Sequence, residues 1–493
     1  MAYENLSDFL NELQDDGELV RVSAEVDPVL EITEIADRIS KRPRGGPALF
    51  FENVKGSTLP VLVNLLGSHK RLLRALGAKS FADVAERIPE LLKPQSAEGW
   101  LDKLKLVPTA AGASKFVPRA VRTAACQQVV KLGRDVDLTE FPVLKNWPGD
   151  AARSISFGQV LTRHPATGVR HAGNFHLPVH DTNSCLIHWH RQQEAWHDFV
   201  EFKKLGIQMP IAVSFGGDPA FPLMAFAPRL PESDPFLLAG LLRGAPCDLV
   251  KCRSIDMEVP ANAEIVLEGY VDPTEPWQMD GAYGGPTGYY SVPRLCPVYH
   301  ITAVTQRANP IYPTTVFGIP PTECYWINKA CERIFLPLVK AAIPEFVDYN
   351  FPQAGGGRQM LFVSIRKTYP QQARKVLNAL WGLWPTLMAK IVVIVDEHVD
   401  VQDEHQVWFR VASNVHPGRD VVFNSVPTDA ADHAAPVEGV GQPMGIDATA
   451  KFPEEAHPRP WPGDLVMPGE IKDLVTNRWA QYGLGRLPTE PAT

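Results

Sequence analysis

What the 493-residue chain lacks sets limits on its class. No apolar run approaches the roughly 18 residues that span a membrane. The N-terminal stretch MAYENLSDFLNELQDDGELV is acidic where a secretory signal would be basic and then apolar. Lys and Arg number 48 against 56 Asp and Glu, and no block of them alternates with aromatics, which argues against nucleic-acid binding. We therefore expect a cytoplasmic protein with no membrane and no nucleic-acid partner.

Cysteine is also scarce. The seven cysteines are odd in number, widely scattered and without a CxxC pair, which indicates reduced thiols in a reducing compartment. Proline, by contrast, is abundant at 45 residues, and this indicates long ordered loops and β-rich regions. A chain of 493 residues is too long for one hydrophobic core, so two or three domains are expected.

The hydrophobic periodicity divides the chain into three regions. Residues 1–115 mix helical and strand patterns, with an amphipathic helix near the start, and predict an N-terminal α/β domain. Residues 116–310 hold short strands between Gly and Pro turns, which is typical of a barrel-like domain. Residues 311–493 return to α/β, with a long Pro- and Gly-rich loop predicted from 424 to about 468 and a helical tail after it.

Histidine is concentrated in one stretch. Seven of the fourteen histidines lie between Ile155 and Phe199. Three strands are predicted there, at 155–161, 169–179 and 184–190. His188 and His190 are two apart and would point to the same face of the third strand. Two imidazoles at that spacing could bind a transition metal, or they could be ordinary lining histidines satisfied by backbone and water.

Three long segments carry motifs of one known family. They are LLAGLLRGAPCDLVKCRSIDMEVPANAEIVLEGYV at 237–271, DGAYGGPTGYYS at 280–291 and VGQPMGIDATAKFPEE at 440–455. With further segments in collinear order over nearly the whole chain, they strongly resemble the UbiD family of reversible decarboxylases. The resemblance implies an N-terminal α/β domain, a central split β-barrel similar to flavin reductases, and a C-terminal α/β domain with an oligomerising tail.

The resemblance also implies an activity. UbiD enzymes use prenylated FMN, supplied by a separate flavin prenyltransferase, to remove CO2 reversibly from aromatic or α,β-unsaturated carboxylic acids, including an aryl acid carried as a coenzyme A thioester. The cofactor takes up the charge left when CO2 departs, and a protein acid protonates the carbon. In the family, manganese and potassium ions bridge the cofactor phosphate to the protein. We therefore expect a small carboxylic acid substrate and a homo-oligomer, either a dimer or a hexamer.

The family's metal-ligand positions carry different residues in this chain. The usual Asn, His and Glu fall on His171, Gln192 and Pro235. His190 lies two places before Gln192, and Asp234 directly precedes Pro235. The candidate metal ligands are therefore His171, His190 and Asp234.

The family's catalytic groups are altered as well. The Arg that orients the substrate carboxylate becomes His176. Of the two acids in the family's E-G-P-x-G-[D/E] motif, the first becomes Asp280, while the second, the expected proton donor, becomes Gly285. Glycine has no side-chain proton to donate, and the imidazole of His176 cannot bind a carboxylate through two parallel N–H donors as a guanidinium does. We predict that His176 and Asp280 form the acid/base pair, since a histidine beside a carboxylate has a pKa movable through neutrality.

The family's flavin contacts map onto residues around the predicted histidine-rich strands. They are Phe175, His176, Leu177, His188, Trp189, His190 and Gln193. Three functions stay open. The first is a prenylated-FMN decarboxylase with a rebuilt site, and the second is a non-catalytic UbiD-like subunit that partners an active paralogue. The third is a metal-dependent enzyme with His171, His188 and His190 as ligands.

Overall fold

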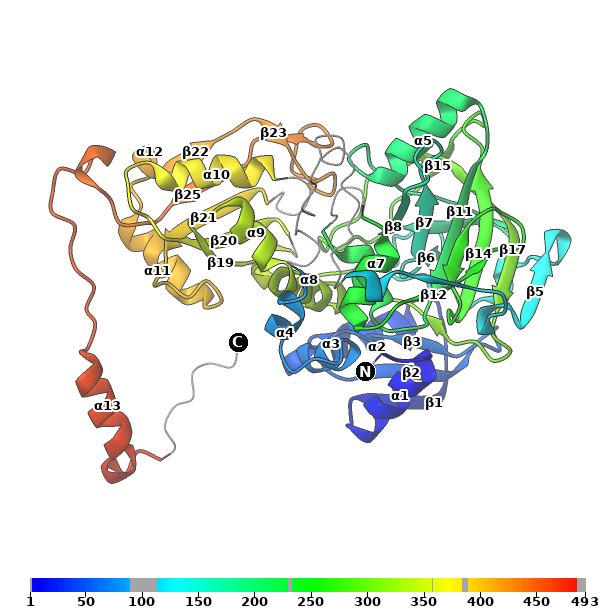
Figure 1. The fold of residues 1–493 in the computed structure, drawn as a ribbon, viewed down its shortest axis with the longest axis horizontal. Helices are drawn as coiled ribbons and strands as arrows, with labels where there is room; N and C mark the ends of the chain where they lie inside the picture. The colour runs from blue at the N-terminus through cyan, green and yellow to red at the C-terminus, as the bar shows by residue number, and fades with distance from the viewer. Residues whose placement is uncertain (1, 89–112, 229–232, 357, 384–388, 486–493) are drawn as a thin grey trace.

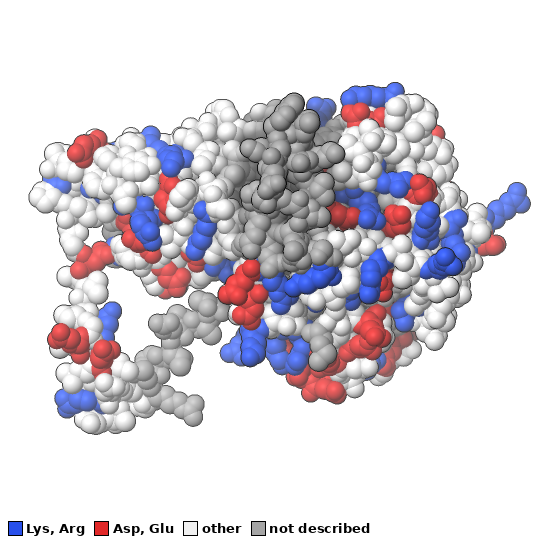
Figure 2. Space-filling view, viewed as in Figure 1, with Lys and Arg blue, Asp and Glu red and all other residues white. Residues whose placement is uncertain are grey.

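The computed structural model describes residues 2–88, 113–228, 233–356, 358–383 and 389–485. The chain forms a multi-domain α/β fold in which an N-terminal part, a central sheet and a C-terminal part lie side by side (Figure 1). No helix within these ranges is long and apolar enough to cross a membrane. On the face shown in Figure 2, basic and acidic side chains are interspersed.

The N-terminal part is a four-stranded sheet with helices. Its strands in spatial order are β1 (Leu19–Val26), β2 (Ala48–Val54), β3 (Val61–Val63) and β18 (Tyr312–Pro313). Its helices are α1 (Leu6–Asp15), α2 (Glu31–Ser40), α3 (His69–Ala75) and α4 (Phe81–Ala85). The predicted first helix is confirmed in α1, where Asn5 caps the N-terminus by accepting a hydrogen bond from the Asp8 N–H. Because β18 pairs in parallel with β3, the chain returns to this sheet after the central part.

The central part is a curled half-barrel sheet. Eight strands follow one path: β6 (Ser154–Ile155), β9 (Leu177–Asp181), β10 (Ser184–Leu186), β17 (Val298–Gln306), β14 (Ile265–Val271), β11 (Met209–Phe215), β7 (Gln159–Arg163) and β8 (Arg170–Asn174). A ninth strand, β5 (Val129–Leu132), pairs with β17. Within the described chain, the end strands β6 and β8 do not pair with each other, so the sheet is curled but open.

The histidine-rich strands are shorter than predicted. The strand expected at 169–179 divides into β8 and β9, with Phe175 and His176 at the break. The strand expected at 184–190 ends at Leu186, where its pairing with β17 stops. The prediction that His188 and His190 share a strand face was therefore wrong, because both lie in the irregular segment that follows. This segment is held beside the break by a 3.1 Å hydrogen bond from the His188 N–H to the His176 carbonyl.

Two small sheets and three helices flank the half-barrel. The sheets are β13 (Glu258–Pro260) with β12 (Asp248–Lys251) and β4 (Arg119–Val121), and β15 (Gln278–Asp280) with β16 (Arg294–Cys296). The helices are α5 (Glu194–Leu205), α6 (Phe221–Phe226) and α7 (Pro235–Arg243). In the ribbon that links β15 to β16, Asp280 lies directly opposite Arg294.

The C-terminal part is a five-stranded sheet. Its order is β19 (Phe346–Asn350), β20 (Met360–Ile365), β21 (Ile391–Asp396), β25 (Met444–Asp447) and β22 (Val421–Phe423). Its helices are α10 (Gln372–Gly382), α11 (Glu404–Asn414) and α12 (Pro417–Asp420), and a short ribbon pairs β23 (Val426–Pro427) with β24 (Val440–Gly441). The prediction of a loop over 424–468 was thus partly wrong. This range contains β25, an inner strand that pairs with β21 and β22. The sequence did not indicate this strand, because four residues are too few to show the period of a strand.

Helix α8 (Glu323–Ile334) joins the parts and is followed by α9 (Leu336–Ala342). It contacts α3 and α4 of the first part, α6 of the central part, and α9 and β19 of the last. Beyond the C-terminal sheet, the chain runs away from the body to α13 (Gly469–Arg478), which has no buried residue and is followed by the short 3-10 helix η10 (Trp479–Tyr482) (Figure 1).

Candidate active site

A cavity of about 380 Å³ lies where the half-barrel, α8 and the C-terminal part meet. Its volume is within the range of pockets that take cofactor-sized ligands. The half-barrel side contributes His176, His188, His190, Gln193 and Tyr283. The opposite side contributes Cys324, Asn328, Cys331, Glu332, Arg358 and Gln359.

The best-defined interaction on the half-barrel wall is between His188 and Asp280. The Nε2 atom of His188 lies 2.6 Å from Oδ2 of Asp280, and the two residues are 3% and 5% exposed. Burial lowers the pKa of His188 below its ordinary value, while the hydrogen bond to Asp280 opposes that shift. Burial thus favours the neutral form of the His188 imidazole, and the Asp280 side chain is in place to stabilise its protonated form.

His176 is held by stacking rather than by hydrogen bonds. Its ring lies on Tyr283 with centroids 3.6 Å apart and planes 16° apart, and it meets the His188 ring edge-on at 5.3 Å. Both of its ring nitrogens are buried and have no hydrogen-bond partner among the described residues. Burial holds the pKa of His176 well below its ordinary value, so the ring is neutral. Asp280 thus pairs with His188, while His176 lines the cavity and has two buried ring nitrogens without a partner among the described residues.

A charged cluster at the rim connects the half-barrel to the C-terminal part. Nδ1 of His190 lies 3.1 Å from Oε1 of Glu438, and Nη1 of Arg294 lies 3.0 Å from the same oxygen. The hydrogen bond from His190 and the charge of Arg294 lower the pKa of Glu438. Since Arg294 also donates to the Trp189 carbonyl, this cluster fixes the segment that carries His188.

The structure separates the predicted flavin contacts into two groups. Phe175, His176, His188, His190 and Gln193 line the cavity. Leu177 and Trp189 do not line it and pack in the hydrophobic core, at 0% and 1% exposed. Trp189 still has an indole N–H that finds no acceptor in the part of the chain that the structure describes.

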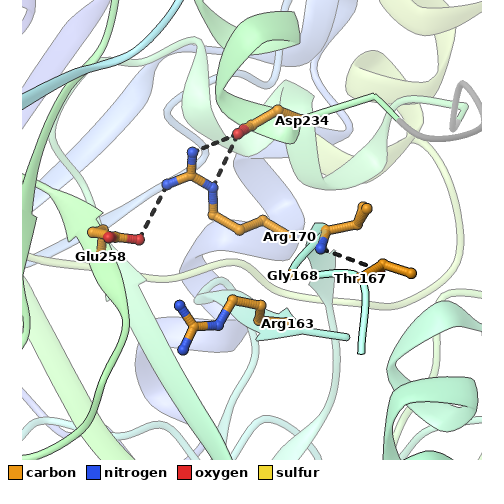
Figure 3. Close-up of a pocket in the computed structure, with 7 residues that line it drawn as sticks. Arg163, Thr167, Gly168, Arg170, Asp234 and Glu258 are labelled. Atoms are coloured by element: carbon orange, nitrogen blue, oxygen red, sulfur yellow. Dashed lines mark hydrogen bonds and ion pairs between the residues drawn. The ribbon is translucent and has the colours of Figure 1, made fainter. Parts of the chain in front are cut away.

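The three predicted metal ligands have separate partners. Nδ1 of His171 lies 2.7 Å from Oδ2 of the buried Asp198. His190 belongs to the rim cluster already described. Asp234 caps α7 and binds Arg170 in a different pocket, where Arg170 also reaches Glu258 (Figure 3).

The positions that the resemblance assigns to metal ligands do not fit a metal ion in the described chain. Pro235 has no side-chain donor, and the Gln192 amide nitrogen donates to the Thr428 carbonyl at 3.3 Å. Among the described residues, no group of three His, Cys, Asp or Glu side chains is arranged to hold a metal ion. The donor set His171, His188 and His190 is likewise divided among Asp198, Asp280 and Glu438.

Several residues in or next to the cavity were not predicted from the sequence. Tyr283 lies inside the DGAYGG motif, so its aromatic ring could have been flagged there. Arg294 and Glu438 are 144 residues apart and meet only through the fold. Arg358 follows a run of three glycines, and Asn328 lies in the middle of α8, where periodicity gives no signal for a polar wall.

Family models match three consecutive stretches of the chain. They are the 3-octaprenyl-4-hydroxybenzoate carboxy-lyase N-terminal domain at residues 10–88, the Rift-related domain at 119–320 and the C-terminal domain at 325–448. An uncharacterized protein of Aquifex aeolicus is 42% identical over 482 residues, which are 98% of this chain and 99% of the relative.

Solved structures with the same fold include two enzymes. Vanillic acid decarboxylase of Sedimentibacter hydroxybenzoicus in its closed form has a TM-score of 0.86 and 26% identity, over 98% of this chain and 100% of that one. An evolved dimeric form of the UbiD-class enzyme HmfF from Pelotomaculum thermopropionicum, in complex with prenylated FMN, has a TM-score of 0.75 and 27% identity, over 95% and 98% of the two chains.

Proposed function

This chain belongs to the UbiD family, and from that premise we propose that it is a non-oxidative carboxy-lyase that uses prenylated FMN. Its substrate is an aromatic or α,β-unsaturated carboxylic acid, free or carried as a thioester. A flavin prenyltransferase supplies the cofactor. The likeness along almost the whole chain to a vanillic acid decarboxylase and to a UbiD-class enzyme in complex with prenylated FMN supports this class of reaction.

The half-barrel wall of the cavity fits a ligand with polar ring atoms. His176 offers two unpaired nitrogens and His188 one, Nδ1, and buried polar atoms of this kind are normally paired in the working state of a protein. Phe175, His190 and Gln193 complete the set of residues that would hold the cofactor. When bound, prenylated FMN supplies the electron sink for loss of CO2.

The observation that carries the proposal is that His188 lines the cavity and is hydrogen-bonded to the buried Asp280. With Nε2–H donating to Asp280, Nδ1 of His188 is left as the atom that can take or give a proton. In decarboxylation, the protonated His188 gives its Nδ1 proton to the carbon that has lost CO2, and the imidazole is reprotonated from water. Carboxylation runs the same transfer in reverse. Asp280 orients the ring and stabilises the imidazolium, and this pair replaces the acid that the family has at the position of Gly285.

The test begins with the cofactor. Protein co-expressed with a flavin prenyltransferase is purified, its ultraviolet-visible spectrum is recorded, and the released small molecules are identified by mass spectrometry. We expect close to one prenylated FMN per chain. Aromatic and α,β-unsaturated acids, free and as coenzyme A thioesters, are then screened for CO2 release.

Two outcomes would overturn the proposal. A colourless protein without flavin would favour the non-catalytic subunit. A flavin-loaded protein that releases no CO2 from any acid, and exchanges no labelled CO2 into the matching products, would remove the decarboxylase assignment. Asp280→Asn should largely abolish CO2 release, and Glu275→Gln is its matched control, because Glu275 also lies 2.6 Å from a histidine, His300, but neither residue lines the cavity.

A further inference from the structure

The wall of the cavity opposite the His188–Asp280 pair carries a cation, Arg358. This residue lies between β19 and β20 of the C-terminal part and faces α8. Its Nη2 atom donates to Oδ1 of Asn328 at 2.9 Å. A guanidinium has five N–H donors, so most of those of Arg358 are not used by this contact.

No carboxylate neutralises Arg358 in the part of the chain that the structure describes. Glu332 lines the same wall one turn of α8 after Asn328, but its carboxylate is already paired with other groups. Its oxygens accept hydrogen bonds from Lys329 at 2.8 and 3.0 Å and from the Phe351 N–H at 2.7 Å. Asp429, another acid at the cavity, accepts from the Ala431 N–H. Among the described residues, Arg358 therefore lines the cavity without a carboxylate in an ion pair with it.

The surroundings of Arg358 are polar as well. Cys324, Asn328 and Cys331 lie on one face of α8, at spacings of four and three residues, and all line the cavity. Burial raises the pKa of Cys331 to about 12, so its thiol is neutral. The carbonyl oxygen of the Gln359 side chain is buried and unpaired among the described residues. A substrate whose far end is a plain hydrocarbon would leave these groups without partners.

We propose that the acid bound in this cavity carries a second anionic group, a phosphate or a second carboxylate, and that Arg358 binds it. The inference rests on the proposed function for the identity of the reacting end. His176, His188 and Asp280 all come from the half-barrel side, so the carboxyl group that leaves as CO2 is handled there. Arg358 comes from the C-terminal part and meets the other end of the molecule. Guanidinium binds carboxylate and phosphate oxygens through paired N–H donors.

Binding of a matched series of but-2-enoic acids tests the proposal without turnover. The series carries hydrogen, hydroxyl, carboxylate or phosphate on carbon 4, and dissociation constants are measured by calorimetry on flavin-free and flavin-loaded protein. We expect the carboxylate or the phosphate compound to bind at least about tenfold more tightly than the hydroxyl compound, because one hydrogen bond between charged groups typically contributes about that much to affinity. The tighter of the two identifies the anionic group.

Arg358→Gln should remove that preference while leaving the affinity for the hydroxyl compound within about twofold, and Arg358→Lys should keep part of it. Arg366→Gln is the control, because Arg366 lies in the same part of the fold but pairs with Glu397 on the surface. Equal binding of charged and neutral compounds by the native protein would refute the proposal. So would an Arg358→Gln variant that weakens all four compounds equally, since Arg358 would then hold the reacting carboxylate.

The same experiment separates this inference from the proposed function. A preference for the charged compounds that depends on Arg358, in a protein that decarboxylates nothing, would leave the anion site standing and remove the proposed function. Decarboxylation by a protein that shows no preference for the charged compounds would support the proposed function and remove the anion site.

Discussion

Replacing Asp280 by Asn removes the negative charge beside His188 while keeping the size of the side chain. In the native protein, burial lowers the pKa of His188 and Asp280 opposes the shift. Without the carboxylate the pKa of His188 falls further, so the protonated ring needed for proton donation is populated only at lower pH. A general acid that is lost or mistuned costs about 10²- to 10⁴-fold in rate, or about 3–5 kcal/mol of barrier.

The assay is the pH dependence of kcat for CO2 release from the acid found in the screen, on flavin-loaded protein. We expect Asp280→Asn to lower kcat by about 10²-fold or more and to move the decline at high pH toward lower pH. The double variant with His188→Gln should be about as slow as His188→Gln alone, because the two residues act as one unit. Native kcat with an unchanged pH profile in Asp280→Asn, at full flavin content, would refute the assignment of His188 as the proton donor.

Three further predictions concern the cavity, helix α8 and the tail. His176→Phe keeps the stack on Tyr283 but removes two unpaired nitrogens, so flavin content after co-expression should fall while the melting temperature does not; undiminished flavin content would contradict the role of His176. Burial raises the pKa of Glu323 from 4.5 to about 7. The protonated side chain therefore contributes stability that is fully present below about pH 4.5 and is lost as the pH rises through about 7. Glu323→Gln should be more stable than the native protein by about 3 kcal/mol at pH 8 and similar to it at pH 5. Equal urea midpoints for the two proteins at pH 8 would disprove this. The tail exposes Leu465, Val466, Met467 and Leu474, which supports a homo-oligomer, a dimer or a hexamer, so deletion of residues 462–493 should give a smaller assembly by light scattering; an unchanged mass would count against it.

The candidate site was only partly predictable. The histidine-rich stretch located the half-barrel wall, because its residues are close in sequence and stay close in the fold. The predicted partner of Asp280 was His176, whereas the structure pairs Asp280 with His188. That difference depends on the break between β8 and β9 and on the end of β10 at Leu186, which turn the two histidines differently. Strand ends are set by pairing with other strands, which the local sequence does not record.

The sequence alone identified the family, and it predicted the order of the three parts and the loss of the acid, arginine and metal ligands that the resemblance implies. These are properties of residue identity at motif positions, so they need no coordinates. The tertiary structure decided which side chains meet: the Arg294–Glu438 contact at the rim, and Arg358 with Asn328 on the far wall. It also decided that His171, His190 and Asp234 go to separate partners. The physical reason is that contacts between distant segments depend on how sheets and α8 pack, and packing is a property of the whole core rather than of any one stretch.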